Sequence, residues 1–156
     1  MIEELSIPSA ALTQMRAHAR ATYPEECCGF LVGTTQGPIR VIHRVEAVAN
    51  QVGSERERRY IIPPAELRVL EASLEGSAEA VVGFYHSHPD HPARPSEFDR
   101  EHAWPWYTYI VLSVDASGSG AIGAFELDDD TLRFRPVPYG EPPSVPTPNE
   151  AVSESS

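Results

Sequence analysis

One segment, HSHPDHPARPSEFD at residues 86–99, constrains the fold more than any other part of the chain. The six residues before it, AVVGFY, are apolar and rich in strand formers, which predicts a buried strand running into His86. Because side chains alternate along a strand, the rings of His86 and His88 would lie on the same face. Ser96 and Asp99 have the spacing of a helix N-cap and its capping acid. A helix start at this point would turn Asp99 toward the histidines.

Two imidazoles and one carboxylate are a ligand set that a catalytic zinc ion uses, because three protein ligands leave the fourth tetrahedral position for water. We therefore predict that His86, His88 and Asp99 bind Zn²⁺, and water on zinc indicates a hydrolase. Asp99 has a second interpretation as a plain helix cap, which is partly compatible with the first. His91 and His102 are expected on the surface, since a further ligand would close the open position.

A zinc hydrolase also needs a base that takes a proton from water and passes it to the leaving amine. The candidates are Glu25 and Glu26, which stand just before the apolar run CGFLVG, itself a predicted buried strand. Alternation along that strand favours Glu26, because it lies two residues before Cys28, which we expect to be buried. Glu25 is the competing candidate, and a plain surface acid is the third interpretation.

The hydrophobic pattern predicts an α/β fold with a mixed sheet flanked by helices. Helices are expected at residues 8–23, from 63 to a cap at Gly76, and from 96 to a point before Pro105. Strands are expected at 28–33 and 39–49, as an antiparallel hairpin, and at 60–62, 80–85, 107–114, 120–127 and 131–137. The polar residues 53–59 predict a loop.

A chain of 156 residues is long enough for one domain with a substantial core, which we place at residues 1–139. Residues 140–156 contain four prolines and almost no apolar side chains, so they predict a flexible tail. The formal net charge of -11 disfavours a nucleic-acid partner, because that binding depends on clustered basic residues. No segment approaches the roughly 20 apolar residues that span a bilayer, so no membrane association is expected.

Cys27 and Cys28 are the only cysteines, and adjacent cysteines do not easily form an unstrained disulfide with each other. This usage fits a reducing compartment, and the acidic start MIEELSIPSA is unlike a signal peptide, so we expect a cytoplasmic protein. Cys28 is expected to be inert packing in an apolar strand. Large aromatics near a strand start are usually core, so Trp104 and Trp106 are expected to be buried.

Together these residues resemble the JAMM/MPN-domain metallopeptidases, and in particular their small free-standing prokaryotic members. The family pattern is a distant glutamate, then His, Ser or Thr, His, seven residues, Ser, two residues and Asp. Every position and spacing is met by Glu26, His86-Ser87-His88, Ser96 and Asp99. The segment PEECCGFLVG also resembles the glutamate-bearing strand of the family, and the resemblance covers roughly residues 7–138.

The resemblance implies a cytidine-deaminase-like architecture in which His86, His88 and Asp99 hold zinc. It implies that Glu26 is the general acid/base and that Ser96 donates a hydrogen bond to the oxyanion. The implied substrate is a ubiquitin-like sulfur-carrier protein, hydrolysed after its C-terminal Gly-Gly. The resemblance does not choose between a linear peptide, an isopeptide conjugate and an amino-acid adduct, and it does not indicate an oligomeric state.

Three arginines, Arg56, Arg58 and Arg59, would be able to contact an acidic carrier, although a solvated loop is the simpler interpretation. Two other functions fit the sequence less well. A catalytically inactive MPN-type scaffold that only binds partners is expected to lack metal ligands, and this chain keeps all of them. A zinc nucleoside deaminase needs HxE together with PCxxC, and the chain has neither.

Overall fold

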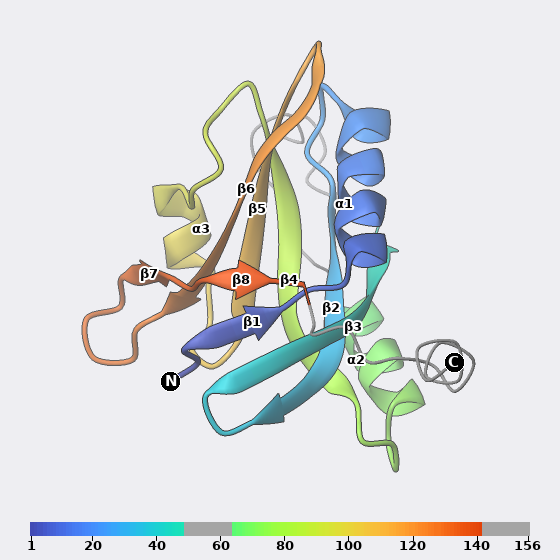
Figure 1. Ribbon diagram of the computed structural model, residues 1–156, viewed down its shortest axis with the longest axis vertical. Helices are drawn as coiled ribbons and strands as arrows, with labels where there is room; N and C mark the ends of the chain where they lie inside the picture. Colours follow the sequence, from blue (N-terminus) through green and yellow to red (C-terminus); the bar gives the residue numbers. More distant parts are fainter. Residues whose placement is uncertain (49–63, 142–156) are drawn as a thin grey trace, which may run out of the picture.

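The computed structural model describes residues 1–48 and 64–141, which form one mixed sheet with helices packed against it (Figure 1). The helices in these ranges are α1 (Ser9–Thr22), α2 (Pro64–Ser73) and α3 (Glu97–Glu101). The strands are β1 (Glu4–Ser6), β2 (Cys28–Gln36), β3 (Ile39–Val48), β4 (Ala80–Pro89), β5 (Thr108–Asp115), β6 (Gly118–Leu127), β7 (Phe134–Pro136) and β8 (Tyr139–Gly140). Their order across the sheet is β7-β6-β5-β4-β2-β3-β1-β8.

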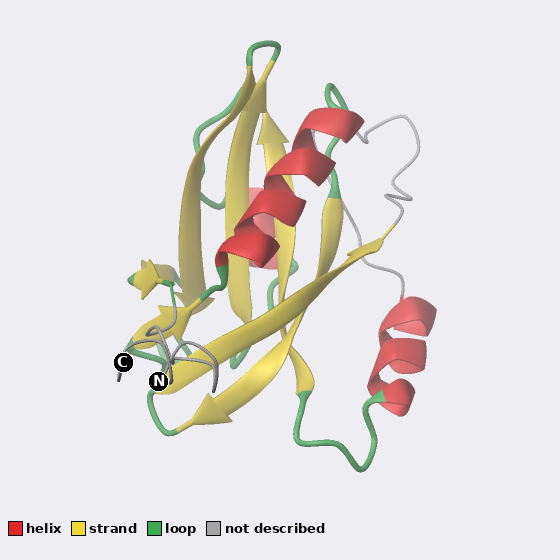
Figure 2. Cartoon of the chain, turned by 45° about the vertical axis from the view of Figure 1, so that its right-hand side comes forward, coloured by secondary structure: helices red, strands yellow, loops and turns green. Residues whose placement is uncertain are grey.

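Strand β4 lies in the middle of the sheet, antiparallel to β2 and parallel to β5. Helix α1 crosses one face of the sheet (Figure 2). Met15 of this helix belongs to the same buried cluster as Tyr85. On the other face Phe84 is buried in a second cluster, against which Leu70 of α2 packs. Every residue of β4 after Ala80 is therefore buried. Cover on both faces explains why this strand is a continuous apolar run up to its histidines.

The expected single α/β domain with a mixed sheet flanked by helices is confirmed. The hairpin of β2 and β3 is antiparallel, as expected, and β2 extends to Gln36 instead of ending at Gly33. Strand β4 was expected at residues 80–85. It continues through both histidines and ends at Pro89. The last expected strand is shorter than predicted and covers only Phe134–Pro136. The expected loop at 53–59 and the short strand at 60–62 lie outside the described residues.

The sequence pattern did not indicate β1 or β8, which have three and two residues. Both are held by parallel pairing, β1 with β3 and β8 with β1. The predicted domain boundary between residues 139 and 140 falls inside β8, and the boundary stays a prediction. Among the described residues, no helix is both long enough and apolar enough to cross a membrane.

The expectation that the two tryptophans are core residues was wrong. Trp104 and Trp106 are each 53% exposed. The nearby core position is filled by Tyr109, which is buried and lies against Phe84. Trp106 has a positive φ of 82°, and its ring lies 4.5 Å from the guanidinium carbon of Arg40. The ring thus covers a buried cation at the surface of the molecule.

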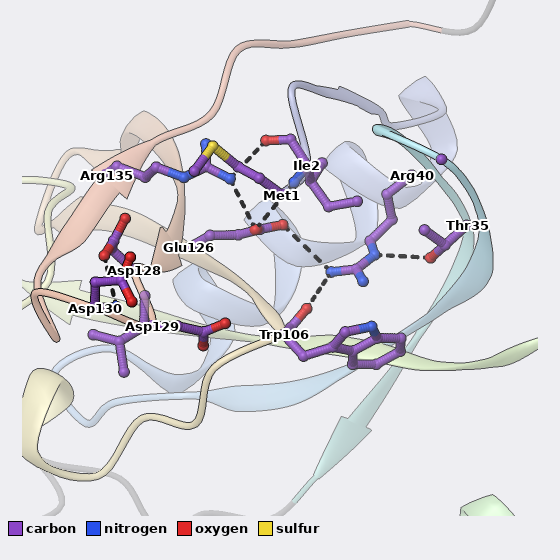
Figure 3. A pocket seen from close by; sticks show the side chains of 12 residues that line it. Met1, Ile2, Thr35, Arg40, Trp106, Glu126, Asp128, Asp129, Asp130 and Arg135 are labelled. Carbon is purple, nitrogen blue, oxygen red and sulfur yellow. Dashed lines mark hydrogen bonds and ion pairs between the residues drawn. The ribbon is translucent and has the colours of Figure 1, made fainter.

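That cation belongs to an ion-pair cluster that joins three strands, β3, β6 and β7 (Figure 3). Arg40, at the start of β3, is fully buried, and its Nη1 donates to the hydroxyl of Thr108 and the carbonyl of Trp106. The same nitrogen lies 3.5 Å from Glu126, whose other oxygen lies 3.0 Å from Arg135. Burial lowers the pKa of Arg40, and Glu126 opposes that shift. One carboxylate therefore balances two guanidinium groups.

We predict that Glu126→Ala lowers the free energy of unfolding by about 3–5 kcal/mol, because it leaves Arg40 buried without its counter-charge. Urea denaturation followed by circular dichroism measures this change. The control is Asp129→Ala, an exposed carboxylate nearby, which should change stability by less than about 0.5 kcal/mol. Equal stability of the Glu126→Ala and wild-type proteins would contradict the structural role of the cluster.

Candidate metal centre

The structure brings His86, His88 and Asp99 together as a buried group at the end of β4 and the start of α3. The two Nε2 atoms of the histidines lie 3.1 Å apart. Oδ2 of Asp99 lies 3.0 Å from Nε2 of His86 and 3.1 Å from Nε2 of His88. The three atoms thus form a nearly equilateral triangle. These are the three residues that the sequence predicted as metal ligands.

The dimensions of this triangle fit a tetrahedral metal ion. Ligands at roughly 2.0–2.1 Å from a tetrahedral ion are separated by about 3.3 Å, close to the observed spacing. Nδ1 of His88 lies 3.0 Å from the carbonyl oxygen of Pro92. A carbonyl can only accept, so this contact assigns the proton to Nδ1 and leaves the lone pair of Nε2 facing the triangle. Such an acceptor behind a histidine is typical of metal sites.

The pKa shifts of His86 and Asp99 also favour the protonation states that bind a metal ion. Burial lowers the pKa of His86, against the opposing effect of Asp99, and so favours the neutral imidazole that binds metals. Burial opposes ionisation of Asp99, but the neighbouring His86 and His88 and the backbone N–H of Ser96 outweigh it. They hold the pKa of Asp99 well below its usual range. A metal ion binds the neutral form of a histidine ring, so two such ligands and one carboxylate together carry a single negative charge, which complements a divalent cation.

Asp99 is both a helix-capping residue and a member of the triangle. The hydroxyl of Ser96 accepts from the backbone N–H of Asp99 at 3.1 Å, and Oδ2 of Asp99 accepts from the N–H of Ser96 at 2.7 Å. This reciprocal pair is a capping box, as the Ser-x-x-Asp spacing predicted. The two interpretations of Asp99 are therefore compatible, because one carboxylate oxygen serves both contacts.

The two candidate bases, Glu26 and Glu25, differ in burial and in position relative to the histidines. Glu26 is buried, with 2% of its surface exposed, whereas Glu25 is only half-buried. In the pairing of β2 with β4, Cys28 lies opposite His86. Continuing this register by two residues places Glu26 opposite His88, on the face of the sheet that carries both histidines. Glu26 also lines a cleft of about 270 Å³, which Glu25 does not line.

The cleft lies beside the triangle and is lined by Glu26, His88, His91, Pro92, Arg94 and Ser96. It thus contains the two residues predicted to act in catalysis, together with one of the predicted ligands. His91 is exposed at its edge and outside the triangle. His102 is exposed and stacks on Phe98, as expected for a surface histidine. Pro92 and Arg94 also line the cleft, and no sequence pattern indicated that they would lie there.

Both cysteines are buried free thiols, and burial of Cys28 agrees with its expected packing role. Burial raises the pKa of Cys27 to about 11 and that of Cys28 to about 12. Neither thiol is a ready nucleophile at neutral pH, because only the thiolate attacks. The arginines Arg56, Arg58 and Arg59 lie outside the described residues, so their suggested contact with a partner stays a prediction.

Comparisons with known proteins agree with this site. Residues 8–126 match the family described as prokaryotic homologs of the JAB domain. The chain belongs to this family. It is similar to "Desampylase" from Haloferax volcanii, with 34% identity covering 83% of this chain and 91% of that protein. It is also similar to a "Probable TtuB-protein conjugate cleaving protease" from Thermus thermophilus, with 32% identity and 71% of each chain covered.

The fold agrees as well. A solution structure of a protein from Desulfitobacterium hafniense superposes with a TM-score of 0.77 at 25% identity, covering 90% of this chain and 94% of that one. The expected relationship to small prokaryotic JAMM/MPN proteins is therefore confirmed, and with it the assignment of the chain as a hydrolase of the peptidase type. The family match gives no support to a nucleoside deaminase. All three candidate ligands are present and assembled, so no observation favours an inactive scaffold.

We predict that the purified protein binds one divalent metal ion per chain, and that His86→Ala and Asp99→Ala weaken this binding by more than about 100-fold. Loss of a ligand should weaken metal affinity more than the 10- to 100-fold typical when a residue that hydrogen-bonds to a ligand is lost. Competition with a chromogenic chelator gives the affinities, and elemental analysis gives the stoichiometry. His91→Ala is the matched control and should bind metal like the wild type. Undiminished binding by Asp99→Ala would leave Asp99 as a helix cap only.

Proposed function

We propose that this protein is a zinc-dependent peptidase or isopeptidase that hydrolyses the bond after the C-terminal Gly-Gly of a ubiquitin-like sulfur-carrier protein or its conjugates. The observation that carries the proposal is the triangle of His86, His88 and Asp99 beside a cleft that Glu26 and Ser96 also line. The names of the two relatives, one a conjugate-cleaving protease, support the substrate class.

In this proposal zinc is held by His86, His88 and Asp99. When bound there, zinc supplies Lewis acidity that polarises the scissile carbonyl and acidifies a water molecule. The protein's own contribution is to present three ligand atoms at nearly fixed spacing from two rigid elements, the end of β4 and the capped start of α3. A fourth protein ligand is absent from the triangle among the described residues, which suits hydrolysis better than a closed structural site.

Glu26 is proposed as the general acid/base. Its carboxylate would take a proton from the attacking water and then deliver it to the leaving amine. The position opposite His88 and the place in the cleft support this role. Glu25 has no comparable position.

Ser96 is proposed to steady the oxyanion of the tetrahedral intermediate. Its hydroxyl oxygen already accepts from the N–H of Asp99, which fixes the side chain at the helix start. The hydroxyl hydrogen is not used in that contact and can be donated to a substrate oxygen in the cleft. Because Ser96 is exposed and lines the cleft, a substrate carbonyl would be able to approach it.

We predict that Glu26→Gln lowers kcat for a carrier protein extended beyond its Gly-Gly by about 10²- to 10⁴-fold, because glutamine cannot carry the proton. The assay follows the released extension by mass spectrometry, with an isopeptide-linked carrier and a single amino-acid adduct run in parallel. Glu25→Gln is the matched control and should remain active. Zinc content should be equal in all three proteins. Full activity of Glu26→Gln would overturn the assigned role.

Ser96→Ala is expected to lower kcat by about 10²- to 10³-fold, as removal of one oxyanion donor does in comparable sites. Ser96→Thr should restore most of this loss, since threonine keeps both the capping oxygen and the donor. Thermal unfolding distinguishes the catalytic effect from loss of the cap, which costs only about 1 kcal/mol. Equal activity of the alanine and threonine variants would exclude Ser96 as the donor.

A further inference from the structure

The chain segment that carries Glu26 is bonded to β4 and its following loop at two points, one on each side of the glutamate. On one side, the hydroxyl of Tyr23 donates to the carboxylate of Asp90, 3.0 Å from each oxygen. On the other side, the backbone N–H of Cys27 donates to the hydroxyl oxygen of Ser87 at 2.9 Å. Glu26 lies between these two contacts, and both connect positions at least 60 residues apart in sequence.

The contact of Ser87 is unusual for neighbouring strands. Its backbone N–H donates to the carbonyl of Cys27 at 3.0 Å, as in an ordinary antiparallel pair. The return bond from the N–H of Cys27 goes to the side chain of Ser87 instead of to its carbonyl. Strand β2 itself begins only at Cys28. The serine hydroxyl therefore extends the connection between β2 and β4 by one residue, up to the position next to Glu26.

Ser87 does not reach the cleft itself. The residue is fully buried, and alternation along β4 turns its side chain away from the face of His86 and His88. Cys27 belongs to the buried cluster under α1, on that same opposite face. A hydroxyl in this place cannot contact the substrate or the three atoms of His86, His88 and Asp99 that face the proposed metal. What it can do is fix the backbone that carries Glu26.

We propose that Ser87 is a positioning residue for Glu26, and that the hydrogen bond between Tyr23 and Asp90 is a second, weaker support of the same segment. The inference rests on the proposed function, in which Glu26 transfers the proton. Removing the Ser87 hydroxyl would leave the N–H of Cys27 without this acceptor in a buried place, where an unsatisfied donor is unfavourable. The segment would then shift to find another partner.

A small shift matters because proton transfer requires contact distances of about 2.6–3.2 Å. Misplacement of a reacting group by about 1 Å can cost about 100-fold in rate. The Tyr23 contact is at the surface, where water can replace it, so its loss should matter less. Threonine at position 87 keeps the same hydroxyl oxygen, which makes Ser87→Thr a conservative test of the hydrogen bond.

The kinetic test compares Ser87→Ala, Ser87→Thr and Tyr23→Phe, with Ser6→Ala as the matched control. Ser6 also has a buried hydroxyl oxygen, in β1, with no hydrogen-bond partner among the described residues. Ser87→Ala should lower kcat by about 10- to 100-fold while KM and zinc affinity stay within about threefold. Ser87→Thr should restore kcat, Tyr23→Phe should lose less than about tenfold, and Ser6→Ala should match the wild type.

A second measurement does not depend on activity. Hydrogen exchange should show the Cys27 amide of the metal-free protein exchanging at least about tenfold faster in Ser87→Ala than in the wild type, with Ser87→Thr protected. If the wild-type protein cleaves no carrier, the proposed function fails, and this exchange result still decides the positioning role. Unchanged Cys27 exchange in Ser87→Ala overturns the proposal. So does a loss of zinc affinity that accounts for the whole loss of kcat.

Discussion

The antiparallel pairing of β2 with β4 is the interaction on which the site depends, because it joins Glu26 to histidines 60 residues later in the chain. Register is critical here, since a slip of one residue would turn Glu26 to the opposite face of the sheet. One glycine helps to fix that register. Gly29 pairs with Tyr85, and a Cβ atom at Gly29 would lie 2.2 Å from the tyrosine ring. Any side chain at position 29 would clash there, so the contact between the tyrosine ring and the glycine favours this register of β2 with β4.

The carboxylate of Asp99 determines the electrostatics of the candidate metal centre. Asp99 accepts the N–H of Ser96 and lies within 3.1 Å of both histidine nitrogens through the same oxygen. Burial alone would favour its neutral form, so the surrounding donors are what keep it ionised. The capping box also fixes the carboxylate through the backbone of α3 instead of through a flexible loop. A metal site gains affinity when its ligands are held in this way before the ion arrives.

The sequence predicted the strand of the histidines and the capped helix start, because each depends on local periodicity or spacing. The role of Glu26 stays a prediction. Features that depend on distant partners were not predictable. β1 and β8 are too short to show a pattern and are defined by pairing with β3 and with each other. Trp104 and Trp106 were misjudged, since no local pattern shows that the ring of Trp106 packs over Arg40, 66 residues earlier. The carbonyl of Pro92 that orients His88 has no sequence signature, since any residue offers a carbonyl.

Alternation along β4 separates two tasks that a metal hydrolase must combine. His86 and His88 point to the face of the cleft, where the chemistry is proposed to occur. Tyr85 and Ser87 point to the face under α1, where they contact His18 and the backbone of Cys27. A residue on the second face can hold the strands in register without crowding the reaction space. This separation explains why the residue between the two histidines is best filled by a small hydroxyl side chain. It must fit within the core and still supply one hydrogen-bond acceptor to the neighbouring strand.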